Sequence, residues 1–531
     1  MYILEILKFD KFSQLAQIQQ STAVVLEPHR GKIFDSNKNI LATNLSIESA
    51  YAEPHRIGDF NGTLKALSEI LNLEEDFVIE RLSRPKFFVW IKRKLSKEEA
   101  GTLKKLNLKG IGFLRESERF YPMGSLASHV LGFVNIDNVG LEGIELYYDD
   151  YLRGTQGYKR IVRDARLREL LALPQLHMPA VDGYNLILTI DSVIQNITEN
   201  ALKDGINKFN AKAASAVVMN PYTGEIFAIA NFPDFIPNFY AQYPQDSLRN
   251  RAICDMFEPG SSFKIVTASA ALEEGLVNIA DLFYCEKGAY RISNHLLHDH
   301  RPHGWLTFKE VIEYSSNIGT VKIAQCLGEK VLYKYVRLYG FGGTTGIDLP
   351  GEIKGFIRPL PRWSGLSLAA IPIGHEVGVT AMQMGTAISV IANSGYLIRP
   401  FMVKRIEDDT GQIIKTANLS YLRRRVISEE TSGYMKEILS GVVKIGTGKK
   451  AGLKDFSSAG KTGTAQKIEA DGTYSHSKYI ASFVGFAPVD NPKIAICVVF
   501  DEPHPIYYGG SVAAPVFAQI ADATLKYFKV K

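Results

Sequence analysis

Two strand–turn–strand patterns, far apart in the chain, constrain the fold more than any other feature of the sequence. Residues 211–232 read AKAASAVVMNPYTGEIFAIANF, in which two apolar runs flank an Asn-Pro-Tyr-Thr-Gly turn. Residues 482–500 repeat the pattern, with predicted strands at 484–487 and 494–500 on either side of an Asp-Asn-Pro turn. Such pairs are typical of β-hairpins. Since helical segments lie between them, we expect an antiparallel sheet packed with helices, whose strands are distant in sequence and adjacent in space.

The chain of 531 residues is longer than one domain usually needs, and its character changes near residues 171–186. Two prolines and an Asp-Gly turn are followed there by the strand-like stretch YNLILTI, a pattern that is typical of a domain boundary. The segment before it mixes short strands, turns and charged helices. We therefore predict an α+β protein with an N-terminal mixed α/β domain at 21–178 and a second domain at 179–531.

The net charge argues against a nucleic-acid-binding protein, and the N-terminal stretch argues against a membrane helix or a signal peptide. The net charge of +5 is mild for so long a chain, so we expect no nucleic-acid partner. The apolar residues of MYILEILKFDKFSQLAQIQQ are interrupted by Glu5, Lys8 and Asp10. A membrane helix needs roughly 20 apolar residues, and a signal peptide needs a basic start and a longer apolar run. From these residues alone we expect no membrane helix in this stretch.

A candidate nucleophile lies in FEPGSSFKIVTASAAL, residues 257–272, where Ser261 follows a Pro-Gly turn and Lys264 comes one helical turn later. Residues i and i+3 share a helix face, so the Lys264 amine can reach the Ser261 hydroxyl. Apolar neighbours would desolvate this amine and lower its pKa, which makes it a base for a serine nucleophile. Alone, the pattern is more typical of a capped helix with a solvated lysine, and Ser-x-x-Lys recurs elsewhere in the chain.

A second polar motif interrupts the apolar pattern of VIEYSSNIGTVKIAQCL, which begins at residue 311. Ser315 and Asn317 are predicted to lie on a loop between two helices, from which a hydroxyl and an amide can be directed at the same point. Taken singly, this motif is more often a simple helix N-cap, because both residue types are favoured there.

The third motif, SSAGKTGTAQKI from residue 457, contains Lys461, Thr462, Gly463 and Thr464. We predict a strand in which Gly463 gives a ligand close access to the backbone, while Lys461 and the two threonine hydroxyls bind a carboxylate. An ordinary edge strand is the alternative interpretation of this motif alone. A Walker A loop is excluded, because no G-x-x-x-x-G-K-[ST] is present. The three motifs together, in this order, are far more specific than any one of them.

The set S-x-x-K, S-x-N and K-T-G resembles that of the penicillin-binding proteins and serine β-lactamases. The flanking stretches EPGSSFKIVT, YSSNIG, GKTGTAQ, SFVGFAP and YYGGSVAAPVF are similar to class B penicillin-binding proteins, most of all to the cell-division and sporulation type. Earlier in the chain, RGKIFDSNKNILA from Arg30, RFYPMG from Arg119 and GLEGIELYYD at 140–149 resemble three N-terminal boxes of that family. Ser36 and Lys38 depart from the first box.

The resemblance implies a fold and a cellular setting. Residues 179–531 would form a penicillin-binding-protein or serine β-lactamase-like transpeptidase domain, and residues 21–178 a pedestal of the penicillin-binding-protein dimerisation type. Residues 1–20 would be a membrane-proximal segment, since family members are held in the bacterial cytoplasmic membrane by an N-terminal helix that is not present in this sequence. The catalytic domain would lie on the outer face of that membrane.

The resemblance also implies a reaction, in which the substrate is a peptidoglycan stem peptide ending in D-Ala-D-Ala. Ser261 would attack the penultimate carbonyl, with Lys264 as its base, and β-lactams would acylate the same serine. Ser315 would relay a proton to the leaving amine, with Lys461 tuning that path. An amine from a neighbouring stem would then take the acyl group, giving a cross-link in septal wall synthesis. No metal or organic cofactor is required.

The remaining site residues would bind the peptide. Asn317 would orient the peptide amide, and Thr462, Gly463 and Thr464 would form the substrate-binding strand, with both threonines holding the terminal carboxylate. The backbone N–H groups of Ser261 and Thr464 would form the oxyanion hole. The expected partners are stem peptides and β-lactams, together with a membrane glycosyltransferase and division proteins.

Other interpretations fit the sequence less well. A β-lactam hydrolase or sensor would share the fold and the serine, but nothing in the sequence identifies a base that activates water. A non-catalytic division scaffold would have no need of the intact motifs. The histidines of HLLHDHRPHGW, from residue 295, could bind zinc, but they lack a familiar structural-zinc spacing. We favour a polar surface loop there and expect no metal.

Overall fold

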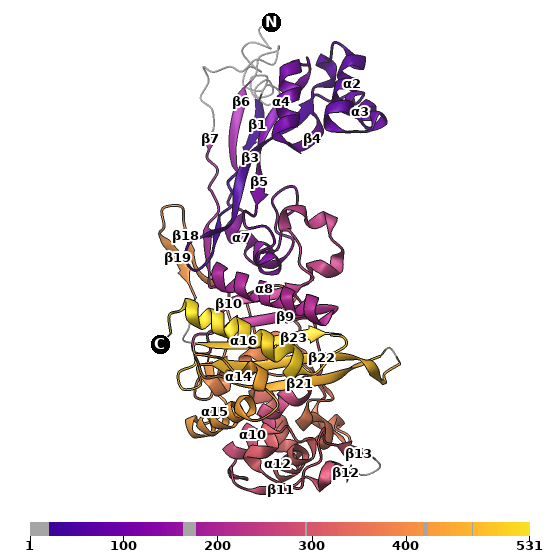
Figure 1. Cartoon of the computed structure of the whole chain (residues 1–531). Helices are drawn as coiled ribbons and strands as arrows, with labels where there is room; N and C mark the ends of the chain where they lie inside the picture. Colours follow the sequence, from indigo (N-terminus) through magenta and orange to yellow (C-terminus); the bar gives the residue numbers. More distant parts are fainter. Residues whose placement is uncertain (1–20, 163–176, 293–294, 418–422, 470, 531) are drawn as a thin grey trace.

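The computed structural model describes residues 21–162, 177–292, 295–417, 423–469 and 471–530. The expected membrane-proximal segment, residues 1–20, lies outside the described residues. The molecule is elongated, with an N-terminal stalk and head above a larger C-terminal body (Figure 1). Among the helices that the structure describes, none is both long enough and apolar enough to cross a membrane.

A five-stranded antiparallel sheet lies at the centre of the C-terminal body. Its order is β10-β9-β23-β22-β21. The strands are β9 (Ala213–Met219), β10 (Ile226–Phe232), β21 (Ala459–Ile468), β22 (Tyr474–Ala487) and β23 (Ile494–Asp501). The two predicted hairpins are confirmed, and β9 pairs with β23 so that they join into one sheet. β22 is longer than predicted because it begins at Tyr474 and not at 484, which extends its pairing with β21.

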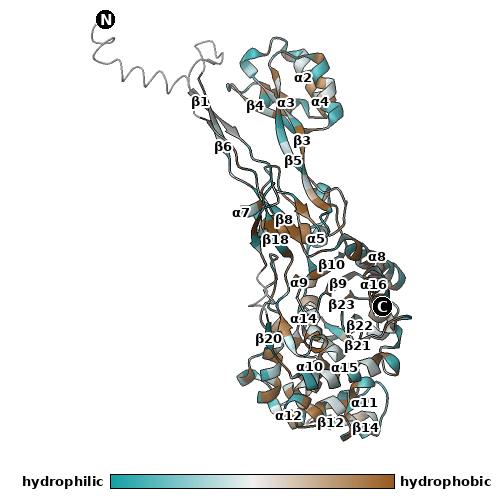
Figure 2. Cartoon of the chain, turned by 90° about the vertical axis from the view of Figure 1, so that its left-hand side faces the viewer, coloured by the Kyte–Doolittle hydropathy of each residue, from teal (hydrophilic) through white to brown (hydrophobic). Residues whose placement is uncertain are grey.

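Helices cover both faces of this sheet, which explains why its strands are buried on both sides and lack polar alternation. In Figure 2 the sheet separates α8 and α16 from α14. These helices are α8 (Ser192–Phe209), α16 (Gly509–Tyr527) and α14 (Ala381–Ala392). Asp191 caps α8 by accepting from the backbone N–H groups of Val193 and Ile194. The predicted antiparallel sheet packed with helices is therefore confirmed.

A helical lobe beside the edge strand β21 carries two of the three motifs. It contains α10 (Lys264–Glu273), α11 (Phe308–Glu313), α12 (Asn317–Leu338) and α15 (Glu429–Lys444). Residues 264–271 of α10 are all buried, because α12, α15 and the turn before it pack around this helix. α11 begins with a capping box, in which Thr307 and Glu310 satisfy each other's backbone N–H groups.

The N-terminal unit is a mixed α/β structure, as predicted. Its seven-stranded sheet has the order β19-β18-β8-β2-β3-β4, with β5 also paired to β3. The strands are β2 (Ile33–Phe34), β3 (Ile40–Ala52), β4 (Val89–Leu95), β5 (Ile111–Phe120), β8 (Asn185–Leu188), β18 (Val403–Glu407) and β19 (Ile413–Thr416). The head helices are α2 (Phe60–Leu71), α3 (Glu75–Leu82) and α4 (Lys97–Leu106). A smaller sheet joins β1 (Ser21–Leu26), β6 (Gly157–Val162) and β7 (His177–Met178).

Shorter elements complete the described chain. The helices are α5 (Ser128–Leu131), α6 (Gly143–Tyr147), α7 (Asp149–Leu152), α9 (Arg251–Cys254) and α13 (Ser367–Ala370). The strands are β11 (Leu282–Tyr284), β12 (Ala289–Ile292), β13 (His295–His298), β14 (Trp305–Thr307), β15 (Phe356–Ile357), β16 (Val377–Gly378), β17 (Tyr396–Ile398) and β20 (Arg423–Arg425). They pair as β11–β14, β12–β13, β15–β16 and β17–β20.

The seven-stranded sheet crosses the sequence boundary that we expect at residue 179. β8 pairs in parallel with β2 and antiparallel with β18, so strands from the second domain extend the sheet of the first. The turn-rich stretch that marks the boundary in the sequence therefore does not divide the sheet, whose hydrogen bonds join strands from both domains.

A buried ion network holds the three N-terminal boxes together. Glu145 is fully buried, and its two carboxylate oxygens lie 2.6 Å from Nε of Arg30 and 2.6 Å from Nε of Arg119. Arg30 also reaches Asp149, with Nη1 2.6 Å from Oδ1. These residues come from three separate segments of the chain, with Glu145 and Asp149 both in the third box, so the network ties the three segments together.

Replacing Glu145 by Gln should destabilise the protein by about 3 kcal/mol, because two buried guanidinium groups would lose their shared counter-charge. The free energy of unfolding from urea titration measures this effect. Glu80→Gln is the matched control, since Glu80 pairs with Arg84 on an exposed surface, where solvent screens the pair and little change in stability is expected. Equal effects of the two substitutions would contradict a structural role for the network.

Candidate active site

Ser261 lies on a tight turn that leads into α10. The turn is a single 3-10 element, Gly260–Phe263, and Gly260 adopts a positive φ of 54°. A Cβ on Gly260 would come within 2.7 Å of the backbone oxygen of Thr464, so glycine permits the turn to pack against β21. Ser261 is partly exposed whereas residues 262–264 are buried. In the described part of the chain the Ser261 hydroxyl forms no hydrogen bond, which leaves it free for a substrate.

The Lys264 amine is completely buried and points at the second motif. Its Nζ donates to the backbone oxygen of Ser315 at 2.7 Å and to Oδ1 of Asn317 at 2.8 Å, and it lies 3.3 Å from the Ser315 hydroxyl. The sequence predicts contact with the Ser261 hydroxyl, but no hydrogen bond joins these two described side chains. The amine donates its hydrogen bonds to acceptors of the second motif instead, because these acceptors lie closer to its buried position.

Lys461 brings a second buried amine to the same point. Its Nζ donates to the Ser315 hydroxyl at 2.8 Å and to the backbone oxygen of Thr462 at 3.3 Å. The Ser315 hydroxyl therefore lies between two lysine amines, from α10 and from β21. The structure brings together Lys264, Ser315, Asn317 and Lys461, as the order of the motifs predicts.

Burial controls the charge of this pair. It lowers the pKa of Lys264 to about 7, against the opposing effect of the Asp299 carboxylate and the Cys285 thiol. Burial also lowers the pKa of Lys461 well below its usual range, and the positive charge of Lys264 lowers it further. The two amines therefore do not both carry a full charge at neutral pH, which makes a neutral amine available for proton transfer.

The loop between α11 and α12 and the first residue of α12 orient the side chains of the second motif. Ser315 has a positive φ of 62°, a conformation that non-glycine residues adopt rarely. Ser316 then caps α12, with its hydroxyl accepting from the Gly319 N–H at 2.9 Å. The Asn317 amide donates to the backbone oxygen of His298 at 3.0 Å, so its carbonyl oxygen faces Lys264.

The third motif lies on β21, the edge strand of the central sheet, as predicted for residues 461–464. A Cβ on Gly463 would meet the Pro259 backbone oxygen at 2.6 Å, so glycine lets this strand pack against the Ser261 turn. The Thr462 hydroxyl lies 2.9 Å from that of Thr447, and the Thr464 hydroxyl accepts from the Gly509 N–H at 2.9 Å. The outer edge of β21 offers backbone groups to a peptide.

Two residues outside the predicted motifs also hold the site. Asp299 accepts from the backbone N–H of Asn317 at 2.5 Å, and Thr447 contacts Thr462 as described above. Neither belongs to a recognisable motif, and they precede the residues they contact by 18 and 15 positions. The only signal near Asp299 was the histidine-rich stretch, which we interpreted as a surface loop.

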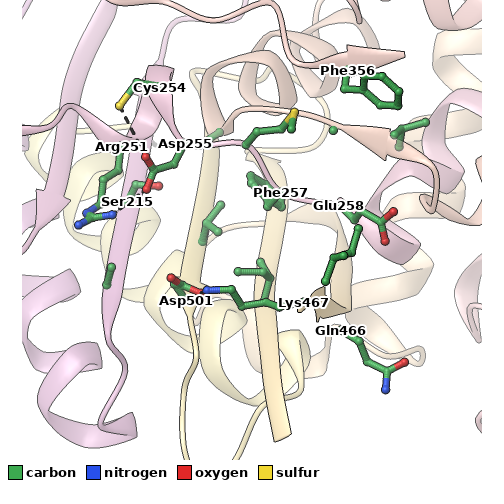
Figure 3. A pocket seen from close by; sticks show the side chains of 18 of the residues that line it. Ser215, Arg251, Cys254, Asp255, Phe257, Glu258, Phe356, Gln466, Lys467 and Asp501 are labelled. Carbon is green, nitrogen blue, oxygen red and sulfur yellow. Dashed lines mark hydrogen bonds and ion pairs between the residues drawn. The ribbon is translucent and has the colours of Figure 1, made fainter. Parts of the chain in front are cut away.

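A cavity of about 590 Å³ lies beside the C-terminal end of β21 and includes none of the predicted site residues (Figure 3). Glu258, which precedes the Ser261 turn, lines it and accepts from the Glu376 N–H at 2.9 Å. Charged groups around it are paired, as shown by Lys467 Nζ 2.7 Å from Asp501 Oδ1. The chemistry of the site therefore comes from the amine cluster and not from this cavity.

The histidine-rich stretch contributes aromatic contacts. The His300 ring stacks on Tyr508 with ring centroids 5.2 Å apart, and the His303 ring stacks on Tyr314 at 5.5 Å. Within the residues that the structure describes, no three His, Cys, Asp or Glu side chains are grouped so that they could hold a metal ion.

Comparison with known proteins yields two family matches. Residues 214–522 match the penicillin binding protein transpeptidase domain, and residues 25–188 match the penicillin-binding protein dimerisation domain. Stage V sporulation protein D of Bacillus subtilis is 38% identical over 531 residues, covering 98% of this chain and 82% of that protein. Peptidoglycan D,D-transpeptidase FtsI of Escherichia coli K12 is 32% identical over 511 residues, covering 94% of this chain and 84% of that protein.

A solved structure is similar along nearly the whole chain. Penicillin binding protein 3 from Mycobacterium tuberculosis, complexed with aztreonam, has a TM-score of 0.75 and 29% sequence identity. The similarity covers 96% of this chain and 98% of that one.

Replacing Lys264 by Met should stabilise the protein at pH 7, because a buried amine of low pKa is removed. The pKa of Lys264 in the folded state, about 7, lies below its unfolded value of 10.5, so unfolding takes up a proton between these pH values. The free energy of unfolding of the wild type should therefore rise relative to that of Lys264→Met, by up to about 1.4 kcal/mol per pH unit, as the pH increases through this window.

Urea unfolding at pH 7 and pH 9.5 measures this difference. Lys203→Met, at an exposed position of α8, is the matched control, and its difference in stability from wild type should be the same at the two pH values. A constant gap between Lys264→Met and wild type at the two pH values would mean that the amine titrates normally in the folded protein.

Proposed function

Because this chain belongs to the class B penicillin-binding proteins, we propose that it is a peptidoglycan D,D-transpeptidase that cross-links stem peptides through an acyl-enzyme on Ser261. The observation that carries the proposal is the Ser315 hydroxyl between two buried amines, beside a turn that presents an unbonded serine. Acyl transfer needs a nucleophile, a base, a proton path to the leaving group and an anchor for the substrate.

Lys264 acts as the base for the nucleophile. A neutral amine has two N–H donors, which match its two short contacts with Ser315 and Asn317. Its lone pair then accepts the Ser261 proton while the serine oxygen bonds to the penultimate D-Ala carbonyl carbon. Burial supports this role, because it lowers the pKa of Lys264 to about 7.

Ser315 and Lys461 complete the reaction. When the tetrahedral intermediate collapses, the carbon–nitrogen bond to the terminal D-Ala breaks, and its amine takes a proton through the Ser315 hydroxyl. The protonated Lys264 amine passes the proton taken from Ser261 to the Ser315 hydroxyl across their 3.3 Å contact, and Lys461, 2.8 Å from the same hydroxyl, tunes this path. An amine from a neighbouring stem peptide then attacks the carbonyl carbon of the Ser261 ester, and the bond from that carbon to the serine oxygen breaks. The same path carries the proton lost by the attacking amine to the serine oxygen, so the cross-link forms and the serine is restored.

The substrate binds along β21. Thr462 and Thr464 hold its terminal carboxylate, with Gly463 between them permitting close approach, and Asn317 orients the peptide amide. The backbone N–H groups of Ser261 and Thr464 stabilise the oxyanion. The packing of the Ser261 turn against this strand supports the assignment, since both N–H groups belong to segments that touch.

The similarity to FtsI and to stage V sporulation protein D supports a setting in septal or spore wall synthesis. We assign residues 1–20 to a membrane-proximal segment, 21–178 to the pedestal and 179–531 to the catalytic domain. The catalytic domain works on the outer face of the bacterial cytoplasmic membrane, where peptidoglycan is assembled. A membrane glycosyltransferase and division proteins are the partners we infer for the pedestal.

A fluorescent penicillin should label the full chain, and the label should persist for hours, because the acyl-enzyme of a transpeptidase excludes hydrolytic water. Ser261→Ala should take no label, since no other group replaces the serine oxygen. Ser477→Ala, at an exposed position on β22, is the matched control and should label like wild type. Gel fluorescence over time measures both properties.

Each alternative function has its own outcome. Rapid loss of label would indicate a β-lactam hydrolase, and absence of label from wild type would indicate a non-catalytic scaffold. A stable label without cross-linked product from stem-peptide substrates would indicate a sensor.

The rate of acylation should rise with pH, with a midpoint at about pH 7, because only the neutral form of Lys264 accepts the serine proton. The second-order rate constant for labelling, measured from pH 5 to pH 9, tests this. A rate that does not vary over this range would exclude Lys264 as the titrating base.

A further inference from the structure

The carboxylate of Asp299 lies at the N-terminus of α12, directly behind the second motif. Its Oδ1 accepts from the backbone N–H of Asn317 at 2.5 Å and of Ile318 at 3.0 Å, and its Oδ2 accepts from the Ser316 hydroxyl at 2.6 Å. A carboxylate at this position satisfies unpaired N–H groups of the helix and interacts favourably with its dipole. Asp299 thus bonds to three consecutive residues, 316–318.

The hairpin that carries Asp299 is itself fixed to the site. The Asp299 N–H donates to the backbone oxygen of Gly288 at 3.1 Å, which closes the β12–β13 hairpin. The preceding residue, His298, accepts from the Asn317 amide at 3.0 Å. Two neighbouring residues therefore hold both the backbone and the side chain of Asn317. The side-chain carbonyl oxygen of Asn317 therefore points toward Lys264.

The charge of Asp299 also acts on the buried amine of Lys264, whose pKa it raises. The charged or titratable groups that act on Lys264 are Lys461 on β21, the Cys285 thiol and the Asp299 carboxylate. Burial raises the pKa of the Cys285 thiol, so this group is neutral at pH 7. Asp299 is therefore the negative charge that opposes desolvation of Lys264.

We propose that Asp299 is a positioning residue for acylation, which holds residues 316–318 in their active arrangement and balances the charge of the buried amines. The proposal rests on the proposed function, since acylation of Ser261 is the step on which it acts. Asp299 touches neither the nucleophile nor the peptide. It acts through Asn317 and Lys264.

The test is the pH dependence of fluorescent-penicillin acylation in the full chain carrying Asp299→Asn. The maximal rate should fall roughly tenfold, because a charge-assisted hydrogen bond to the Asn317 backbone is lost. The midpoint should move about one pH unit lower, because the pKa of Lys264 falls when the opposing charge is removed. A merely structural role would lower the rate without moving the midpoint.

Two further variants separate charge from geometry. Asp299→Glu keeps the charge but displaces it, so its midpoint should stay near that of wild type while its rate falls. Asp281→Asn is the matched control, since the Asp281 carboxylate accepts from the Asn278 N–H in an exposed turn and should change neither quantity. If Asp299→Asn does not fold, as judged by thermal unfolding, Asp299→Glu decides the matter. A wild-type rate in that variant would overturn the proposal.

The results distinguish this inference from the proposed function. A wild-type protein that takes no label contradicts both. A labelled wild type together with Asp299→Asn that keeps the wild-type rate and midpoint overturns only the role of Asp299.

Discussion

Two buried lysine amines share one hydroxyl, and the rest of the catalytic body is arranged around that constraint. Among the described residues, neither Lys264 nor Lys461 forms an ion pair, so burial must be balanced by hydrogen bonds and by a neutral amine. Those hydrogen bonds come from α10, from the loop before α12 and from β21. Packing of three separate segments is thus what buries the two amines and lowers their pKa values.

Glycine at two positions allows that packing. Gly260 and Gly463 face each other's segments, and a side chain on either would meet backbone oxygen within 2.7 Å. The turn that bears Ser261 and the strand that bears Lys461 therefore pack backbone against backbone. Their separation is set by the main chain rather than by flexible side chains.

The sequence predicted the central sheet because turn residues and apolar runs are local signals, and hairpins at both ends of a domain have few ways to pair. It also predicted the members of the amine cluster, through three motifs. It did not predict that Lys264 would turn from Ser261 to Ser315 and Asn317, because side-chain direction depends on acceptors supplied by other segments. Asp299 and the pairing of β8 with β2 were missed for the same reason, since both are long-range contacts without local periodicity.

The sheet shared by β2, β8 and β18 has a consequence for how such a protein evolves. β8 runs directly into α8, and β18 follows α14 after the short strand β17, so the strands that complete the N-terminal sheet lie close along the chain to helices on opposite faces of the central sheet (Figures 1 and 2). Exchanging the pedestal between relatives at the sequence boundary would keep the pairing of β2 with β3 but would set β2 of one protein against β8 of another. The sheet of the pedestal therefore depends on strands that the chain encodes on both sides of Ser261.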